Sequence, residues 1–267
     1  MIGPALLFCP ADRPDRYHKA LAAADTIIVD LEDAVAPHRK ANARQMLLEH
    51  PLDPERVIVR VNPVATSDFG ADLRAVKQSA YRSVMLAKTE NPSDLDLVDG
   101  FDVIALCETA RGVLEAGAIA AHPSVTGLMW GAEDLIASLG GQSSRFPSGA
   151  YRDVSLHARS TVLLAARAQL KDAIDSVWLD IPNLDGLAAE ASDAVASGFV
   201  AKACIHPSHA PIIRDAYAPT AAQVAWAERV TAAAAEGGVV QLDGQMLDAP
   251  LLRQAERVVA AHRQTSG

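Results

Sequence analysis

Basic residues are in the minority in this sequence of 267 residues. Lys and Arg number 24 against 33 Asp and Glu, which leaves a net charge of −9. Broad binding to nucleic acids or anionic membranes needs a basic surface, so the composition argues against both partners, although a few local cations can still bind a small anion. No run approaches the roughly 18 apolar residues of a membrane span. Residues 1–4 also lack the pattern of a signal peptide.

Cysteine is equally scarce. The three cysteines, Cys9, Cys107 and Cys204, are an odd number, lie far apart in apolar stretches and form no CxxC pair. This pattern excludes a disulfide framework and a zinc knuckle. We therefore expect three buried, reduced thiols and a soluble cytoplasmic protein.

Glycine-rich phosphate-binding motifs are missing. Neither GxGxxG nor GxxxxGK[ST] occurs, and the first strand-like run leads into Phe8-Cys9-Pro10 instead. A doubly wound open sheet usually carries such a motif after its first strand. That fold is therefore the less favoured of the two that an alternation of strands and helices permits.

What the sequence does contain is a series of eight short aliphatic runs, separated by helical patterns rich in Ala, Leu and Arg. Most are continuously apolar, as is typical of parallel strands buried on both faces. They cover residues 5–8, 26–31, 56–61, 83–87, 102–107, 126–130, 176–180 and 202–205. This alternation predicts a (β/α)₈ TIM barrel. We expect the barrel over residues 1–217 and a helical extension over residues 218–267, with helices at 220–236 and 250–262.

Polar residues collect at the predicted carboxyl ends of these strands, which in such a barrel converge on the mouth that holds the active site. A single one would merely begin a loop, but carboxylates at three ends beside two cations predict a functional site. The residues are Glu32 and Asp33, Arg60, Lys88, Glu108, Glu133 and Asp134, with Asp180 after the seventh run.

Several carboxylates at one mouth repel one another unless a cation lies among them. Oxygen ligands without His or Cys partners select a hard cation, usually Mg²⁺. Glu108 and Asp134 are 26 residues apart, about one β/α unit, so neighbouring strands would bring them together as direct ligands. Substrate oxygens and water would complete the coordination, and Glu32 and Asp33 could hold the bound waters.

Arg60 is predicted to emerge into the same mouth. Its planar guanidinium matches a carboxylate bidentately, which indicates a substrate with at least one carboxylate. A metal that chelates an α-oxo acid held by Arg60 would polarise the ketone and stabilise an enolate. The chemistry best served is the making or breaking of a carbon–carbon bond next to a carbonyl.

With these residues in view, the chain resembles the citrate lyase β-subunit-like proteins of the HpcH/HpaI aldolase superfamily. The resemblance follows the family's order along nearly the whole chain. It rests on residues 29–35 (VDLEDAV), 59–62 (VRVN), 106–109 (LCET), 130–135 (WGAEDL), 205–207 (IHP) and 244–250 (GQMLDAP).

The resemblance implies a barrel that assembles as a homotrimer, in which the C-terminal segment of one subunit closes the mouth of its neighbour. It implies Mg²⁺ at Glu108 and Asp134, and a substrate carboxylate at Arg60. Asp248 matches the acid of the C-terminal segment that moves protons at the acyl methyl carbon. Taken without the resemblance, Asp248 would be an N-cap before Pro250.

Family members cleave or form β-hydroxyacyl thioesters. The resemblance therefore implies a Mg²⁺-dependent carbon–carbon lyase that acts on a citramalyl-, malyl- or hydroxymethylglutaryl-type CoA ester and yields an acyl-CoA and an α-keto acid. We expect Glu32 and Asp33 to assist catalysis, and Ala132 and Glu133 to contact the substrate beside Asp134. Three alternatives stay open. They are a citrate lyase subunit that acts on citryl groups of an acyl carrier protein, a malate synthase-like enzyme that hydrolyses the thioester, and a non-catalytic barrel that binds CoA.

Three basic residues after the first run, Arg13, Arg16 and Lys19, could meet the phosphates of CoA or could form a solvated helix face. Two segments depart from the family pattern. Cys9-Pro10-Ala11 stands where Val-Pro-Gly is common, and Ala87-Lys88 stands where Pro-Lys is common. The second departure predicts a looser placement of Lys88.

Overall fold

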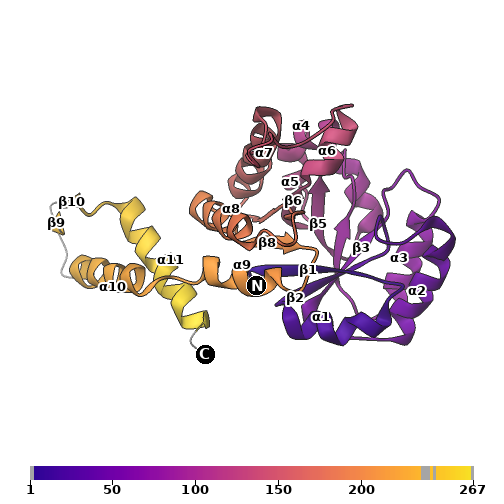
Figure 1. The fold of residues 1–267 in the computed structure, drawn as a ribbon, viewed down its shortest axis with the longest axis horizontal. Coiled ribbons are helices and arrows are strands. Elements are labelled where there is room, and N and C mark those ends of the chain that lie inside the picture. Colours follow the sequence, from indigo (N-terminus) through magenta and orange to yellow (C-terminus); the bar gives the residue numbers. More distant parts are fainter. Residues whose placement is uncertain (1–2, 236–240, 243–244, 266–267) are drawn as a thin grey trace. The chain divides into compact units, whose positions relative to one another are not determined.

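Eight parallel strands pair in chain order, and the pairing of β1 with β8 closes them into a barrel (Figure 1). The strands are β1 (Ala5–Pro10), β2 (Thr26–Asp30), β3 (Val57–Val61), β4 (Ser83–Leu86), β5 (Asp102–Cys107), β6 (Val125–Trp130), β7 (Asp172–Asp175) and β8 (Ala201–Cys204). The computed structural model describes residues 3–235, 241–242 and 245–265. It confirms the predicted (β/α)₈ barrel and excludes the open sheet.

Helices follow the strands and cover the outside of the barrel. They are α1 (Tyr17–Ala23), α2 (Lys40–Glu49), α3 (Phe69–Gln78), α4 (Ala110–Leu114), α5 (Ala116–Ala120), α6 (Ala132–Ser138), α7 (Asp153–Ala168), α8 (Leu184–Ser197) and α9 (His209–Tyr217). Short 3₁₀ helices occupy Pro14–Arg16, Pro37–Arg39, Pro54–Arg56 and Pro92–Val98. Each of these four begins with proline, whose fixed φ suits a first helical turn.

The barrel interior is filled by aliphatic side chains from all the strands. The central cluster consists of Leu6, Ile28, Ile58, Met85, Ile104, Leu106, Met129, Ile174, Ala201 and Ala203. Because successive side chains of a strand point to opposite faces, Phe8, Asp30, Arg60 and Glu108 stand two positions beyond members of this cluster and face the same interior. The apolar core therefore ends in a polar layer at the carboxyl end of the barrel.

The seventh strand corrects one sequence-based expectation. The predicted strand at 176–180 is wrong, because β7 comprises Asp172–Asp175, and Asp180 is an exposed loop residue. The true strand is short and carries an acid at each end, so it does not stand out as an apolar run. Asp175 is buried because Lys202 of β8 lies 2.9 Å from its Oδ2 and Trp130 donates to its Oδ1. The other strands lie within two residues of their predicted bounds.

The chain divides into two compact units, residues 1–213 and 214–267. This division falls inside α9, near the boundary expected after residue 217. The second unit contains α10 (Ala221–Ala235), α11 (Ala249–Thr265) and the two-residue strands β9 (Gln241–Leu242) and β10 (Gln245–Met246), which pair antiparallel. Gly244 of the 244–250 segment lies outside the described residues. In the part of the chain that the structure describes, no helix is long and apolar enough to span a membrane.

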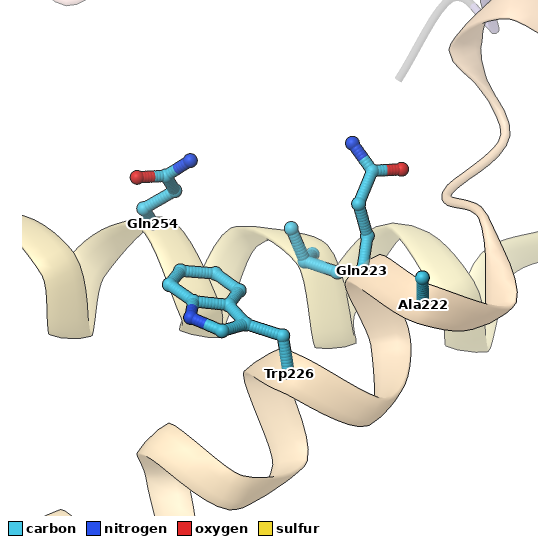
Figure 2. Close-up of a pocket in the computed structure, with 5 residues that line it drawn as sticks. Ala222, Gln223, Trp226 and Gln254 are labelled. Atoms are coloured by element: carbon cyan, nitrogen blue, oxygen red, sulfur yellow. The ribbon is translucent and has the colours of Figure 1, made fainter. Parts of the chain in front are cut away.

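Helices α10 and α11 pack through a small apolar core of Ala227, Val230 and Ala255. A cavity of about 310 Å³ lies beside it and is lined by Ala222, Gln223, Trp226, Gln254 and Val258. In Figure 2 the Trp226 indole extends from α10 toward α11. Every residue that lines this cavity in the described part of the chain is uncharged and lacks a nucleophile, so the cavity offers no chemistry.

Candidate active site

Arg60 is held at the end of β3 by two carboxylates. Its Nε and Nη2 lie 2.8 and 2.5 Å from Oδ1 and Oδ2 of Asp30, and its Nη1 lies 2.9 Å from Oε2 of Glu32. The guanidinium also lies over the ring of Phe8, 4.8 Å from its centroid. Burial opposes the charge of Arg60, but Asp30 and Glu32 outweigh burial and raise its pKa. Arg60 is therefore a permanent and oriented cation in the mouth.

The bidentate edge of Arg60, which we expected to face a substrate carboxylate, instead holds Asp30 in this structure. Of the five guanidinium N–H donors, three contact Asp30 and Glu32 among the described residues, and two are left for a ligand. Sequence reasoning did not assign Asp30 to the site. The signal was present, because Asp30 is the charged residue of an otherwise uncharged strand, and the parallel register pairs it with Arg60.

Lys88 lies among four carboxylates at the mouth. Its Nζ is 2.5 Å from Oε1 of Glu32, 3.1 Å from Oδ2 of Asp33, 3.3 Å from Oδ1 of Asp134 and 3.9 Å from Oε1 of Glu108. We call these four acids the carboxylate cluster. The structure thus brings together Glu32, Asp33, Glu108 and Asp134, which the sequence placed at three different strand ends. Lys88, which was also expected at the mouth, contacts all four.

Glu108 is the most deeply buried member of the carboxylate cluster, with 2% of its surface exposed. Burial and the charge of Asp134 raise the pKa of Glu108 to about 8, although Lys88 and Arg60 act in the opposite direction. Gly131 makes room for it, because a Cβ at that position would lie 2.6 Å from Oε2 of Glu108. Asp134 is more open, with 34% of its side chain exposed. One ligand candidate is therefore fixed inside the barrel and the other faces the mouth.

This donor set fits a hard divalent cation. Four carboxylates surround one ammonium, and burial together with the charge of Asp134 raises the pKa of Glu108. Within the described residues no three or more His, Cys, Asp or Glu side chains converge as a metal site. An ion held by Glu108 and Asp134 would thus need further oxygens from substrate and water, as Mg²⁺ commonly does.

Ala132 and Glu133, which we expect to contact the substrate, make local contacts at the start of α6. Ala132 is buried at the start of α6, and its backbone N–H donates to Ser176 Oγ at 3.4 Å. Glu133 turns toward the loop after α6, where its Oε1 accepts a hydrogen bond of 2.6 Å from Ser144. Glu133 therefore anchors this loop in the structure. Its expected contact with substrate stays a prediction.

A second set of residues ties the ends of β2 and β3 together. Lys40 donates to the carbonyl oxygens of Leu31 and Glu32 and to Oδ1 of Asn62. The amide of Asn62 donates to Leu31 and to Asp72, which is fully buried. These bonds hold the backbone that carries Glu32. Residue patterns along the chain could not reveal them, because the partners come from four separate elements.

The arginines after β1 line a surface cavity. Arg13, Arg16 and Arg39 contribute to its wall together with Pro10, Asp12, Ala34 and Ala36, and the cavity measures about 240 Å³. Arg39 lies 3.0 Å from Asp12, and Arg13 pairs with Asp15. Lys19 is exposed and does not belong to the lining residues. The structure therefore groups two of the three predicted cations and adds Arg39.

Asp248 lies just before α11 and is exposed. Its Oδ1 accepts a hydrogen bond of 3.1 Å from the backbone N–H of Leu251, which is an N-cap interaction. One carboxylate oxygen is thus engaged within its own helix. The expected role of Asp248 at a neighbouring subunit stays a prediction.

Comparison with known proteins shows the family to which the chain belongs. The family model HpcH/HpaI aldolase/citrate lyase matches residues 5–207. A citrate lyase subunit beta-like protein of Mycobacterium tuberculosis is 53% identical, over 96% of this chain and 94% of its own. A (3S)-malyl-CoA thioesterase of Cereibacter sphaeroides is 34% identical, over 91% of this chain and 89% of its own.

A solved structure is similar over both units of the chain. The crystal structure of protein CitE from Mycobacterium tuberculosis, in complex with magnesium, acetoacetate and coenzyme A, has a TM-score of 0.94. It is 51% identical in sequence and covers 98% of this chain and 98% of its own. The chain therefore belongs to the HpcH/HpaI aldolase/citrate lyase family.

Proposed function

We propose that this protein is a Mg²⁺-dependent carbon–carbon lyase that cleaves a β-hydroxyacyl-CoA of the citramalyl, malyl or hydroxymethylglutaryl type. In the cleavage, the β-hydroxyl group loses its proton and becomes the carbonyl of a keto acid, which is an α-keto acid for the citramalyl and malyl types and a β-keto acid for the hydroxymethylglutaryl type. The electron pair of the broken bond goes to the acyl carbon, which takes up a proton to give the acyl-CoA. The observation that carries this proposal is the convergence of Glu108 and Asp134 on one ammonium, beside Arg60.

Glu108 and Asp134 would hold the ion. When bound, Mg²⁺ supplies Lewis-acid polarisation of the oxygens on the substrate. The magnesium and coenzyme A bound to the Mycobacterium tuberculosis protein support the same cofactor and thioester class for this chain. Glu32 and Asp33 border the place where water and substrate oxygens would lie, and Lys88 contacts both acids.

Arg60 binds the substrate carboxylate through the two N–H donors that Asp30 and Glu32 leave open. Asp30 keeps the guanidinium plane fixed, so that little conformational entropy is lost when the substrate binds. Arg60 therefore orients the keto acid and does not move a proton.

The cavity lined by Arg13, Arg16 and Arg39 is our candidate for the phosphates of CoA. Arginine suits phosphate because its planar donors bind two oxygens at once. The cavity lies at the carboxyl ends of β1 and β2, on the side of the barrel that carries the active site. Lys19 does not line the cavity, so this proposal keeps Arg13 and Arg16 and has Arg39 in place of Lys19.

Asp248 of a neighbouring subunit delivers the proton to the acyl carbon, in a homotrimer whose C-terminal units cover the mouths of adjacent barrels. The support is the family segment that contains Asp248 and the exposure of its side chain. We also propose a cytoplasmic location, which the burial of Cys9, Cys107 and Cys204 supports.

The test is cleavage of purified β-hydroxyacyl-CoA esters with and without Mg²⁺. We expect Glu108→Gln to lower turnover by roughly a hundredfold or more, because the ion loses its buried ligand. Glu55→Gln, at an exposed acid, is the matched control. Turnover that is unchanged in Glu108→Gln, or that does not need a divalent ion, would overturn the proposal. Release of free CoA thiol in the same assay would identify the thioester hydrolysis named for the Cereibacter sphaeroides relative.

A further inference from the structure

Lys88 lies where the proposed ion has to bind. Its ammonium contacts Asp134 at 3.3 Å and Glu108 at 3.9 Å, and these are the two acids that would coordinate the ion. It also contacts Glu32 and Asp33 on the other side of the mouth. One ammonium thus contacts all four members of the carboxylate cluster, and Glu32 is also paired with Arg60.

The position of Lys88 is built by the backbone. Its φ of 48° lies in the left-handed region, which a lysine enters only at a cost in conformational energy. The neighbouring residues hold this turn, because Thr89 donates its backbone N–H to Leu106 and its hydroxyl to Leu86. In this conformation the backbone N–H of Lys88 donates to Oε1 of Glu108 at 3.2 Å. The looser placement expected from Ala87 stays a prediction.

Lys88 and a divalent ion would compete for the same two carboxylates, Glu108 and Asp134. Arg60 is engaged by Asp30 and Glu32, and among the described residues Lys88 is the cation in contact with Glu108, Asp134 and Asp33. Two cations that contact the same carboxylate oxygens repel each other, and the repulsion is stronger in a partly buried site than in water because the effective dielectric constant is lower. The ammonium therefore has to leave Glu108 and Asp134 when the ion coordinates them, although it can keep Glu32 and Asp33.

We propose that Lys88 is an internal competitor of the metal ion. In the metal-free protein its ammonium contacts both ligand acids, and this makes the binding of Mg²⁺ weak. An α-keto acid brings a negative charge that the displaced ammonium can pair with, and so its arrival strengthens the binding of Mg²⁺. Lys88 is thus a positioning residue that couples metal loading to substrate. This inference rests on the metal site of the proposed function.

The experiment is a calorimetric titration of the full-length protein with Mg²⁺, with and without pyruvate as the α-keto acid. It is done at the same pH, about 9, for every variant, because metal binding depends on pH. Lys88→Met and Lys88→Gln remove the charge, Lys88→Arg keeps it, and Lys77→Met removes an exposed lysine on α3 as a control. Two neutral variants are used in case one is not tolerated in the fold.

We expect both neutral variants to bind Mg²⁺ about tenfold or more tightly than wild type when pyruvate is absent, because a repelling charge has been removed. Pyruvate should tighten Mg²⁺ binding strongly in wild type and only weakly in these variants. Mg²⁺ should also raise the melting temperature of the neutral variants more than that of wild type. Lys88→Arg and Lys77→Met should stay close to wild type in all three measurements.

Neutral variants that are folded and bind Mg²⁺ no more tightly than wild type would overturn the role of Lys88. The same holds if Lys88→Arg binds as tightly as Lys88→Met, because charge would then not be the cause. A wild-type protein that binds no Mg²⁺ with or without pyruvate would overturn the metal site itself, and with it the proposed function. The two failures are therefore distinguishable.

Discussion

Asp30 and Arg60 form a buried, two-point ion pair across neighbouring strands, with distances of 2.8 and 2.5 Å. The same carboxylate also orders the loop after β2, because its Oδ1 accepts from the backbone N–H of Glu32 and its Oδ2 from that of Ala34. One side chain thus orients both the substrate-binding arginine and the segment that carries Glu32.

Replacing Asp30 with Asn should therefore damage stability and substrate binding together. Removing one partner of a buried pair leaves the other charge poorly compensated, so we expect a loss of about 3 kcal/mol in the free energy of unfolding. The KM for the keto acid should rise as Arg60 loses its fixed orientation. Urea denaturation and steady-state kinetics measure the two effects. Asp15→Asn, in the exposed pair with Arg13, should leave the unfolding transition where it is, and a similar result for Asp30→Asn would contradict this view.

Metal binding should depend on pH through Glu108. Its pKa of about 8 in the metal-free protein means that the carboxyl is mostly protonated at neutral pH, whereas a metal ligand must be ionised. The affinity for Mg²⁺ should therefore rise from pH 6.5 to about pH 8.5, with release of close to one proton per ion at pH 7. Calorimetry in buffers of different ionisation enthalpy measures this release. An affinity that stays constant over the same range would disprove the assignment.

The same pKa predicts how the stability of the metal-free protein changes with pH. The carboxyl of Glu108 titrates near 4.5 when unconstrained and near 8 in the fold, so the folded state binds more protons between these values. Stability from this group is complete below the lower value and is lost as the pH rises toward the upper one. In Glu108→Gln, the free energy of unfolding should therefore change less with pH between about 4.5 and 8. Saturating Mg²⁺ should reduce the same pH dependence in wild type.

Shared active sites can be detected by mixing two inactive chains. Arg60→Ala disables the barrel site, and Asp248→Asn disables the acid that we place in a neighbour's mouth. Co-expression of the two variants should restore up to about one quarter of wild-type activity in randomly assembled trimers, because one site in four combines two intact halves. Leu251→Ala, next to the N-cap contact, is the folding control. If the mixture stays inactive while both chains co-assemble, Asp248 acts within its own chain or not at all.

The arginine-lined cavity predicts that the enzyme prefers thioesters of CoA to thioesters of dephospho-CoA. Arg39→Ala and Arg16→Ala should each raise the KM for a CoA thioester by about tenfold and leave kcat nearly unchanged, since a charge-assisted hydrogen bond contributes roughly 1.5 kcal/mol or more. The rise should shrink at high salt and with a thioester of dephospho-CoA. Lys19→Ala is the matched control, because Lys19 does not line the cavity. Equal effects of all three variants would show that net charge, and not this cavity, attracts the substrate.

Much of the fold was predictable because buried parallel strands have a local signature. Continuous aliphatic runs such as that of β2 identify themselves, and the residues that follow them are expected at the mouth. Strand β7 escaped detection because Asp172 and Asp175 interrupt its apolar character, and the burial of Asp175 depends on Lys202 from another strand. A charge that is neutralised by a distant partner looks like a loop residue when the sequence is examined alone.

The amino-acid sequence by itself determined the barrel and the set of acids at its mouth, including Glu108 and Asp134, because apolar periodicity and strand-end position are properties of neighbouring residues. Only the tertiary structure decided which charges pair. It assigned Asp30 to Arg60, turned Glu133 toward Ser144 and placed the ammonium of Lys88 between Asp134 and Glu32. The physical reason is that ion pairing depends on distances of a few ångströms between residues far apart in the chain, and barrel closure sets those distances.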